Sequence, residues 1–218
     1  MSSSAASAAA ARTAPSLTRR GSETRKALLD STITLIASKG YAATTTQAVL
    51  DHSGISRGSL LHQFKTRDVL MVAVAEEAME RMFDAVREKL SAVGDPIDAM
   101  RRYPSVLWEM QNEHPARAFA ELQLASRWED GLQLGLRRSV KAVNERISRE
   151  LHEIAQANGL RSVDKLIVEV RALISAMQGL AVSSALIADE QKIQEVLDAL
   201  ESHYGDCLER SISRVQGR

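Results

Sequence analysis

Apolar side chains recur every three or four residues along most of this 218-residue chain, and no segment alternates strictly between apolar and polar positions. The first pattern is typical of amphipathic helices, whereas the second would indicate half-buried strands. Only 4 prolines interrupt the pattern, and abundant Ala, Leu, Glu and Arg favour helices. The chain is therefore predicted to be all-α, and its 44% apolar residues are enough to build a core.

Capping and turn residues divide this pattern into about nine helices. Ser22 begins the first helix and Lys39-Gly40 ends it. Asp95-Pro96 opens the fifth helix, and His114-Pro115 is expected to break it. The predicted helices span about 22–39, 45–53, 57–64, 67–93, 96–113, 116–127, 132–157, 163–188 and 190–215.

Residues 1–21 are almost all Ser, Ala, Thr and Arg, with no acidic residue. Such a stretch buries too little apolar surface to offset the entropy of ordering, so it is predicted to be a disordered tail. Three roles stay open for it: an inert tail, a basic arm that adds nonspecific DNA affinity, or an organellar transit peptide.

The net charge of zero hides an uneven distribution. Residues 1–67 hold 9 Lys and Arg against 3 Asp and Glu, while residues 68–218 hold 19 against 25. A basic end joined to an acidic remainder indicates that one end meets a polyanion. The single Cys207 allows no intrachain disulfide, which fits a reducing cytoplasm. Since no apolar run approaches the roughly 20 residues of a membrane span, we expect no membrane partner.

The segment from Thr44 to Arg67 contains two short predicted helices separated by Gly54. This arrangement matches a helix-turn-helix, whose second helix lies in the major groove of DNA. Inward-facing apolar residues are expected to hold the two helices against the first helix: Ile55, Leu60 and Phe64. The start of the second helix can present amides and hydroxyls to phosphates and base edges.

Residues 24–67 resemble the DNA-binding region of the TetR (tetracycline-repressor) family of transcriptional regulators. The matching residues are Thr24-Arg25, Gly40-Tyr41, Ala43-Thr44, Ser53 to Gly58, Leu60, His62, Phe64, Lys65 and Arg67. The resemblance implies a helix-turn-helix domain at 22–68, with the motif itself at about 45–64. A helical domain for effector binding and dimerisation would follow at 69–218.

The resemblance also implies which residues touch DNA. Bases or phosphates would be contacted by Thr45, Thr46, Ser56, Arg57, Gly58, Ser59, His62, Lys65 and Arg67. Gln47 is polar and could reach an adenine. Leu61 stands where the family usually has a tyrosine, so a hydroxyl–phosphate hydrogen bond is missing, and Leu61 could contact a thymine methyl instead.

The last two predicted helices, about 163–215, carry apolar stripes interleaved with small residues. Two such helices from each of two chains would make a four-helix interface, and the resemblance implies the same homodimer. An intramolecular core is the alternative. The predicted interface residues are Val170, Ile174, Met177, Val196, Leu200 and Tyr204. Two recognition helices related by a twofold axis would read a palindrome.

The predicted helices between 67 and 157 hold most of the aromatic and sulfur-containing side chains. They could line a cavity for a small hydrophobic or aromatic effector, with ordinary core packing as the alternative for each residue. The candidate ligand-binding residues are Met82, Phe83, Tyr103, Trp108, Gln111, His114, Phe119, Gln123, Trp128 and Met177.

Together these features predict a DNA-binding repressor of the bacterial cytoplasm and nucleoid, released from a palindromic operator when the effector shifts the conformational equilibrium. The tilt of the helix at 67–93 is the expected lever. The chain's 5 histidines are scattered, and it has no phosphate loop or nucleophile elbow, so we expect no enzyme, cofactor or metal. The alternatives are an activator, a ligand-independent regulator, or a helical protein-interaction module without DNA function.

Overall fold

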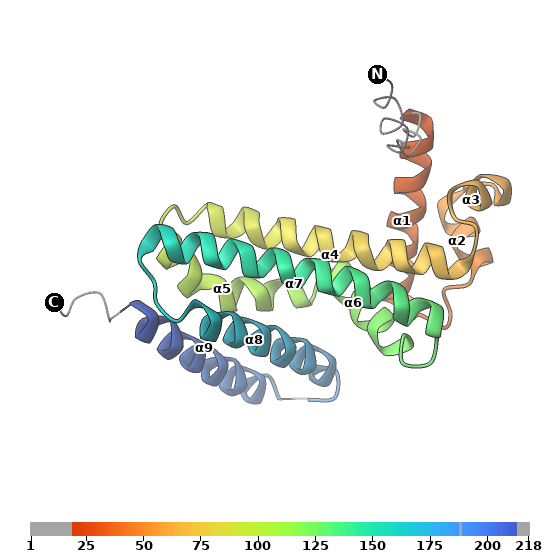
Figure 1. The fold of residues 1–218 in the computed structure, drawn as a ribbon. Helices are drawn as coiled ribbons and strands as arrows, with labels where there is room; N and C mark the ends of the chain where they lie inside the picture. Colours follow the sequence, from red (N-terminus) through yellow and green to blue (C-terminus); the bar gives the residue numbers. More distant parts are fainter. Residues whose placement is uncertain (1–18, 188, 213–218) are drawn as a thin grey trace, which may run out of the picture.

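A computed structural model describes residues 19–187 and 189–212, and within these ranges the chain forms nine α-helices and no strand (Figure 1). This confirms the all-α prediction. The helices are α1 (Arg19–Lys39), α2 (Thr46–Ser53), α3 (Arg57–Gln63), α4 (Arg67–Ser91), α5 (Pro96–Gln111), α6 (His114–Ala125), α7 (Asp130–Asn158), α8 (Val163–Ser184) and α9 (Glu190–Ile212).

Several helix boundaries differ from the predicted ones; α8, for example, ends at Ser184 and not at 188. Helix α1 begins at Arg19 rather than Ser22, so the last three residues of the predicted disordered tail are helical. The rest of that tail, 1–18, and the predicted end of α9 at 213–215 lie outside the described residues. His114-Pro115 forms the start of α6 and does not lie in the connection before it. Proline is tolerated there because the backbone N–H groups of the first helical turn have no partner within the helix.

Local hydrogen bonds explain why the short helices start where they do. The side chains of Thr45, Ser56 and Thr66 each accept a hydrogen bond from the backbone N–H three residues later, at 3.1–3.2 Å. Gly54 ends α2 with φ of +67°, a left-handed conformation that glycine adopts without strain. These caps produce the tight turn between α2 and α3.

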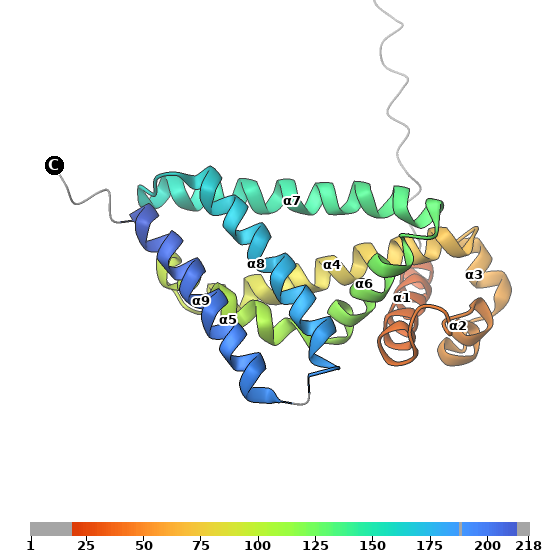
Figure 2. The same cartoon turned by 90° about the horizontal axis from the view of Figure 1, so that it is seen from below.

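One apolar core joins α1–α3 to the larger helical part of the chain. Leu28, Val74, Leu122 and Leu132 come from four different helices and Phe64 directly follows α3, and all five are fully buried in this cluster. Helix α4 runs from beside α3 along the whole bundle (Figures 1 and 2). The helix-turn-helix therefore shares its core with α4, α6 and the start of α7.

A second apolar cluster holds α5, α8 and α9 together with the end of α7. Helices α8 and α9 lie side by side, and α8 diverges from α7 after the turn that connects them (Figure 2). Val170, Met177 and Tyr204 are buried in this cluster within one protomer. Their assignment to the dimer interface is corrected, because side chains already enclosed cannot meet a partner chain.

The opposite face of α8 is apolar and uncovered. Its exposed stripe is Val168, Ala172, Ser175, Gly179, Val182 and, just past the helix, Leu186. Among the described residues, α8 is the one helix long and apolar enough to cross a membrane by length and composition, although 33% of it is buried in the protein. Its apolarity thus arises from two faces, one inside the protomer and one outside. Of the predicted interface residues, Val196 on α9 is exposed, whereas Ile174 and Leu200 are half-buried.

The shared core predicts unequal costs for two leucines of α6. Leu122→Ala empties a fully buried site, which is expected to lower the free energy of unfolding by about 2–5 kcal/mol. Leu124→Ala is the control, because that side chain is 49% exposed, and its effect is expected within about 0.5 kcal/mol. Urea titrations at one fixed protein concentration measure both values. Equal effects would contradict the assignment of Leu122 to the core.

Candidate DNA interface and ligand cavity

The first turn of α3 presents a compact polar surface. Ser56 caps the helix, and its Oγ lies 2.9 Å from the Oγ of Ser59. Arg57, Gly58 and Ser59 are exposed, whereas Ile55, Leu60 and Phe64 pack against the core. The predicted division of this segment into an inward apolar side and an outward polar side is confirmed.

Gly58 stands in open space. A Cβ built on Gly58 would meet no heavy atom within 4 Å, so packing in the protomer does not require a glycine there. Glycine also weakens a helix by roughly 0.5–1 kcal/mol relative to alanine. The missing side chain leaves the backbone of this exposed turn open to close approach by another molecule.

The cations of the motif differ in what they touch. Arg57 and Lys65 are exposed and form no ion pair within the described ranges. Arg67 instead donates hydrogen bonds to the hydroxyl and the carbonyl of Tyr41, lies 3.6 Å from Glu129, and stacks on the Tyr41 ring at 4.2 Å. The guanidinium of Arg67 is thus held by partners within the protein, while 31% of the side chain stays exposed, and its predicted contact with phosphate stays a prediction.

The remaining predicted DNA residues differ in exposure and in the hydrogen bonds that they make. His62 is exposed, and Leu61 is exposed for half of its surface. Thr45 is exposed with its hydroxyl used as a cap, and Thr46 is half-buried. The side-chain amide of Gln47 donates to Asp51 at 2.7 Å and would have to leave that partner to meet a base.

Sequence reasoning did not connect α1 with this surface. Gln63, at the end of α3, donates to the carbonyl of Gly21 at 3.0 Å, so the first turn of α1 lies beside the recognition helix. Arg19 and Arg20 are exposed on that turn. The guanidinium of Arg25 stacks on the ring of Phe64 at 4.5 Å and holds the two helices together. The sequence assigns the basic pair at 19–20 to the tail, because the cap signal at Ser22 begins the helix three residues too late.

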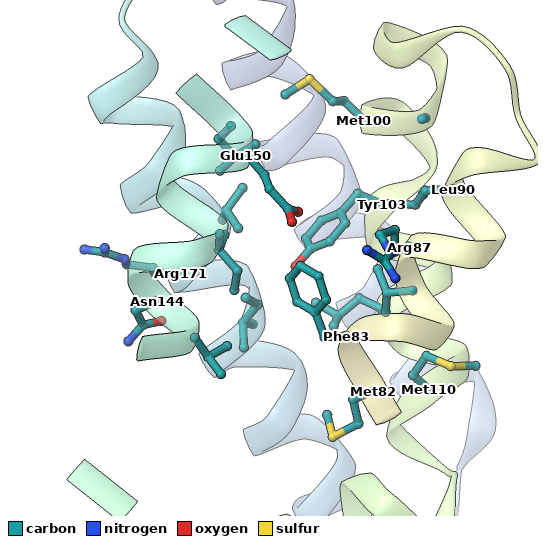
Figure 3. Close-up of a pocket in the computed structure, with 18 of the residues that line it drawn as sticks. Met82, Phe83, Arg87, Leu90, Met100, Tyr103, Met110, Asn144, Glu150 and Arg171 are labelled. Atoms are coloured by element: carbon teal, nitrogen blue, oxygen red, sulfur yellow. The ribbon is translucent and has the colours of Figure 1, made fainter. Parts of the chain in front are cut away.

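A cavity of about 600 Å³ lies between α4, α5, α7 and α8, with contributions from α6 and α9 (Figure 3). Its wall is mainly apolar. Phe83 and Tyr103 point into it from α4 and α5, and Met82 and Met110 lie toward one end (Figure 3). Burial raises the pKa of Tyr103 above its ordinary value, so its hydroxyl stays protonated.

Six of the ten predicted ligand residues line this cavity: Met82, Phe83, Tyr103, Gln111, Phe119 and Gln123. The other four do not, which corrects their placement. Trp128 is 84% exposed beside Arg127, and His114 is exposed at the start of α6. Met177 is buried in the second cluster, and Trp108 packs against that cluster. Local sequence could not show which aromatic residues face inward.

Gln178 on α8, a polar residue that the sequence suggests for the cavity, does line it. The rest of the wall contributed by α7 and α8 was not predicted, and it includes Asn144, Ile147, Glu150 and Arg171. These residues carry no distinctive sequence pattern, and only the crossing of α7 over α4 and α5 brings them to the cavity. Within the described ranges, no three His, Cys, Asp or Glu residues gather where they could hold a metal ion.

Helix α6 connects the cavity with the DNA-binding part. Phe119 lines the cavity, while Glu121 on the same helix accepts a hydrogen bond from the backbone N–H of Tyr41 at 3.1 Å. Tyr41 also donates its hydroxyl hydrogen bond to Glu129, just beyond α6. Burial, followed by this hydrogen bond, raises the pKa of Tyr41 to about 12. The phenol therefore remains a donor at neutral pH, and the contact joins the two parts of the chain.

Comparison with known proteins identifies the DNA-binding region. Residues 28–74 match the bacterial regulatory proteins of the tetR family. The transcriptional repressor KstR2 of Mycolicibacterium smegmatis is 28% identical over 87 residues, which is 40% of this chain and 42% of KstR2. The chain thus spans less than half the length of that relative. The transcriptional repressor Rv1474c of Mycobacterium tuberculosis is 28% identical over 180 residues, 82% of this chain and 91% of Rv1474c.

Solved structures extend the likeness beyond the motif. A TetR-family transcriptional regulator from a Rhodococcus species has the same fold, with a TM-score of 0.69 and 23% identity, over 88% of this chain and 99% of that one. The multidrug binding protein EbrR, solved with ethidium, gives a TM-score of 0.57 and 25% identity over 82% of this chain and 98% of EbrR.

The helix-turn-helix and its capped second helix lie within residues 28–74, the segment that matches the tetR family of bacterial regulatory proteins. Along more of its length the chain is similar to a repressor, and in fold to regulators, of that kind.

The open position of Gly58 generates a test. Gly58→Ala is expected to raise the free energy of unfolding by about 0.5–1 kcal/mol, because alanine is the better helix former. The added methyl group is expected to weaken specific DNA binding by about 1–3 kcal/mol, the scale of one lost base contact. Denaturation and fluorescence anisotropy with duplex DNA measure the two effects. A variant that is more stable yet binds DNA like the parent would show that nothing approaches this backbone.

Proposed function

We propose that the protein is a homodimeric repressor that binds a palindromic operator and leaves it when a small apolar effector occupies the cavity. The observation that carries this proposal is the exposed first turn of α3, where Arg57 has no internal ion pair and Gly58 has no packing role. We place its action in the bacterial cytoplasm, at the nucleoid.

Contacts with DNA divide into two kinds in this proposal. Arg57 and Ser59 reach base edges from the start of α3, and Leu61, one turn further on, meets a thymine methyl. Thr45, Ser56, His62 and Lys65 meet phosphates, together with Arg19 and Arg20 from α1. Arg67 acts indirectly, since it fixes Tyr41 beside the motif.

The exposed stripe on α8 supports a dimer. A run of small and apolar residues one helical turn apart lets two helices approach closely, and burial of this face removes apolar surface from water. Val196 on α9, another predicted interface residue, is also exposed. A twofold axis through this face would place two recognition helices for successive major grooves, about 34–36 Å apart.

Release of DNA requires an effector that binds one conformation better than the other. Helix α4 carries Met82 and Phe83 in the cavity and begins at Arg67 beside the motif. Helix α6 carries Phe119 in the cavity and Glu121 on Tyr41. A shift of either helix would change the spacing of the two recognition helices, with a coupling of about 1–3 kcal/mol.

Two substitutions test the DNA contacts after an operator has been selected from genomic fragments. Arg57→Ala is expected to lower specific affinity by about 1–3 kcal/mol and to relax the preference at one base pair. Lys65→Ala is expected to weaken binding to every sequence alike and to reduce the slope of log affinity against log salt by about one unit. If both variants bind like the parent, α3 is not the recognition helix.

The dimer face is tested with a matched pair of exposed residues. Val182→Asp places a charge on the α8 stripe, and Leu134→Asp places one on α7; the parent side chains are 51% and 57% exposed. We expect Val182→Asp to give monomers in sedimentation velocity and to lose most operator affinity, while Leu134→Asp stays dimeric. A dimeric Val182→Asp protein would place the interface elsewhere.

A further inference from the structure

One buried polar group in the cavity wall has no internal partner. Gln111 is 6% exposed and lines the cavity, and its Nε2 is the only buried side-chain nitrogen or oxygen without a hydrogen-bond partner among the residues the structure describes. Its neighbours in the wall, Met110 and Phe119, are buried and apolar. A buried N–H donor without an acceptor is costly, so a group that supplies one at this position is favoured.

The charged groups of the wall are already engaged. Arg87 pairs with Asp84 at 3.0 Å, and Glu150 lies 3.6 Å from Arg146. Arg171 donates to the hydroxyl of Ser148 at 3.0 Å.

The remaining charged wall residue, Asp95, caps its own helix through two backbone N–H groups at 2.9 Å. Arg87, Asp95 and Arg171 are exposed, and Glu150 is partly so. A charged group on the ligand would therefore gain no buried counterion, because Arg171, whose hydrogen-bond partner is the neutral hydroxyl of Ser148, is itself exposed to water.

We infer that the effector is an uncharged, mainly apolar molecule that carries an oxygen acceptor, such as a ketone, and that the side-chain amide of Gln111 donates a hydrogen bond to that oxygen. The inference rests on the proposed effector role of the cavity and specifies the chemistry of its ligand. The apolar wall supplies affinity, and Gln111 fixes the orientation of the bound molecule.

The place of Gln111 in the fold links this contact to DNA binding. Gln111 is the last residue of α5, and α6 begins three residues later. An acceptor held by Gln111 therefore acts at the start of the helix whose Glu121 contacts Tyr41. A ligand without the acceptor can fill the cavity but leaves this position unpaired.

The experiment compares two probes of nearly equal shape, benzophenone and diphenylmethane, which differ in a carbonyl and a methylene. Isothermal titration of the full-length parent is expected to show roughly tenfold tighter binding of benzophenone, the scale of one satisfied buried donor. Two charged relatives, para-carboxybenzophenone and para-(aminomethyl)benzophenone, are expected to bind more weakly than benzophenone. Photocrosslinking of benzophenone, mapped by mass spectrometry, is expected to label peptides of α4 and α5.

Gln111→Met keeps the length of the side chain and removes the amide. This variant is expected to bind the two uncharged probes alike, with its affinity for diphenylmethane not reduced. Its melting temperature without ligand is expected to equal or exceed that of the parent, because an unpaired buried group is lost. The matched control is Gln156→Met, at an exposed position of α7 that does not line the cavity, where the preference for benzophenone is expected to persist.

The outcomes separate the inference from the function beneath it. Crosslinks in the cavity with equal affinity for both uncharged probes in the parent would overturn the role of Gln111 and leave the effector cavity standing. Tighter binding of a charged relative would overturn the claim of an uncharged ligand. If no probe binds and no cavity peptide is labelled, the proposed effector site itself fails.

Discussion

The structure depends on one continuous apolar core that α1–α4, α6 and the start of α7 build together. Phe64, from the end of the recognition helix, and Leu132, from the start of α7, are buried in the same cluster. Side chains packed at this density transmit displacement instead of absorbing it. The DNA-binding part is therefore a firmly attached end of the helical body, and a rearrangement of α4 or α6 must change the direction in which α3 points.

Polar contacts of Tyr41 at the edge of this core also connect the DNA-binding part with α6. The guanidinium of Arg67 stacks on the ring of Tyr41 and donates a hydrogen bond to its hydroxyl. Tyr41 in turn donates hydrogen bonds to Glu121 on α6, through its backbone N–H, and to Glu129 in the following turn, through its hydroxyl. Its raised pKa, about 12, keeps the phenol protonated well into the alkaline range. The sequence suggests that Arg67 binds phosphate, yet its guanidinium donates hydrogen bonds to Tyr41 within the protein. The segment from Thr44 to Arg67 thus contains both exposed polar residues and residues, such as Arg67, that fix the motif to the rest of the chain.

Helix α8 shows how one element can serve two surfaces. Its inner face closes the second core and borders the cavity, while its outer stripe of small and apolar residues stays uncovered in the protomer. A second protomer packed on the outer face would contact α8, the helix that also lines the cavity. Ligand occupancy and the relative position of two protomers are then connected through a single helix, as the proposed release from DNA requires.

Sequence alone determined the all-helical class, the short capped helices around Gly54 and the exposed polar turn from Ser56 to Ser59. Those features arise from contacts between residues three or four apart, so local spacing encodes them. Tertiary structure alone decided that Arg67 turns inward, that Met177 and Tyr204 face their own protomer, and that Gln111 lies unpaired in a cavity completed by α7 and α8. An apolar stripe shows which face of a helix avoids water, but which neighbour covers that face depends on contacts between residues far apart in the chain.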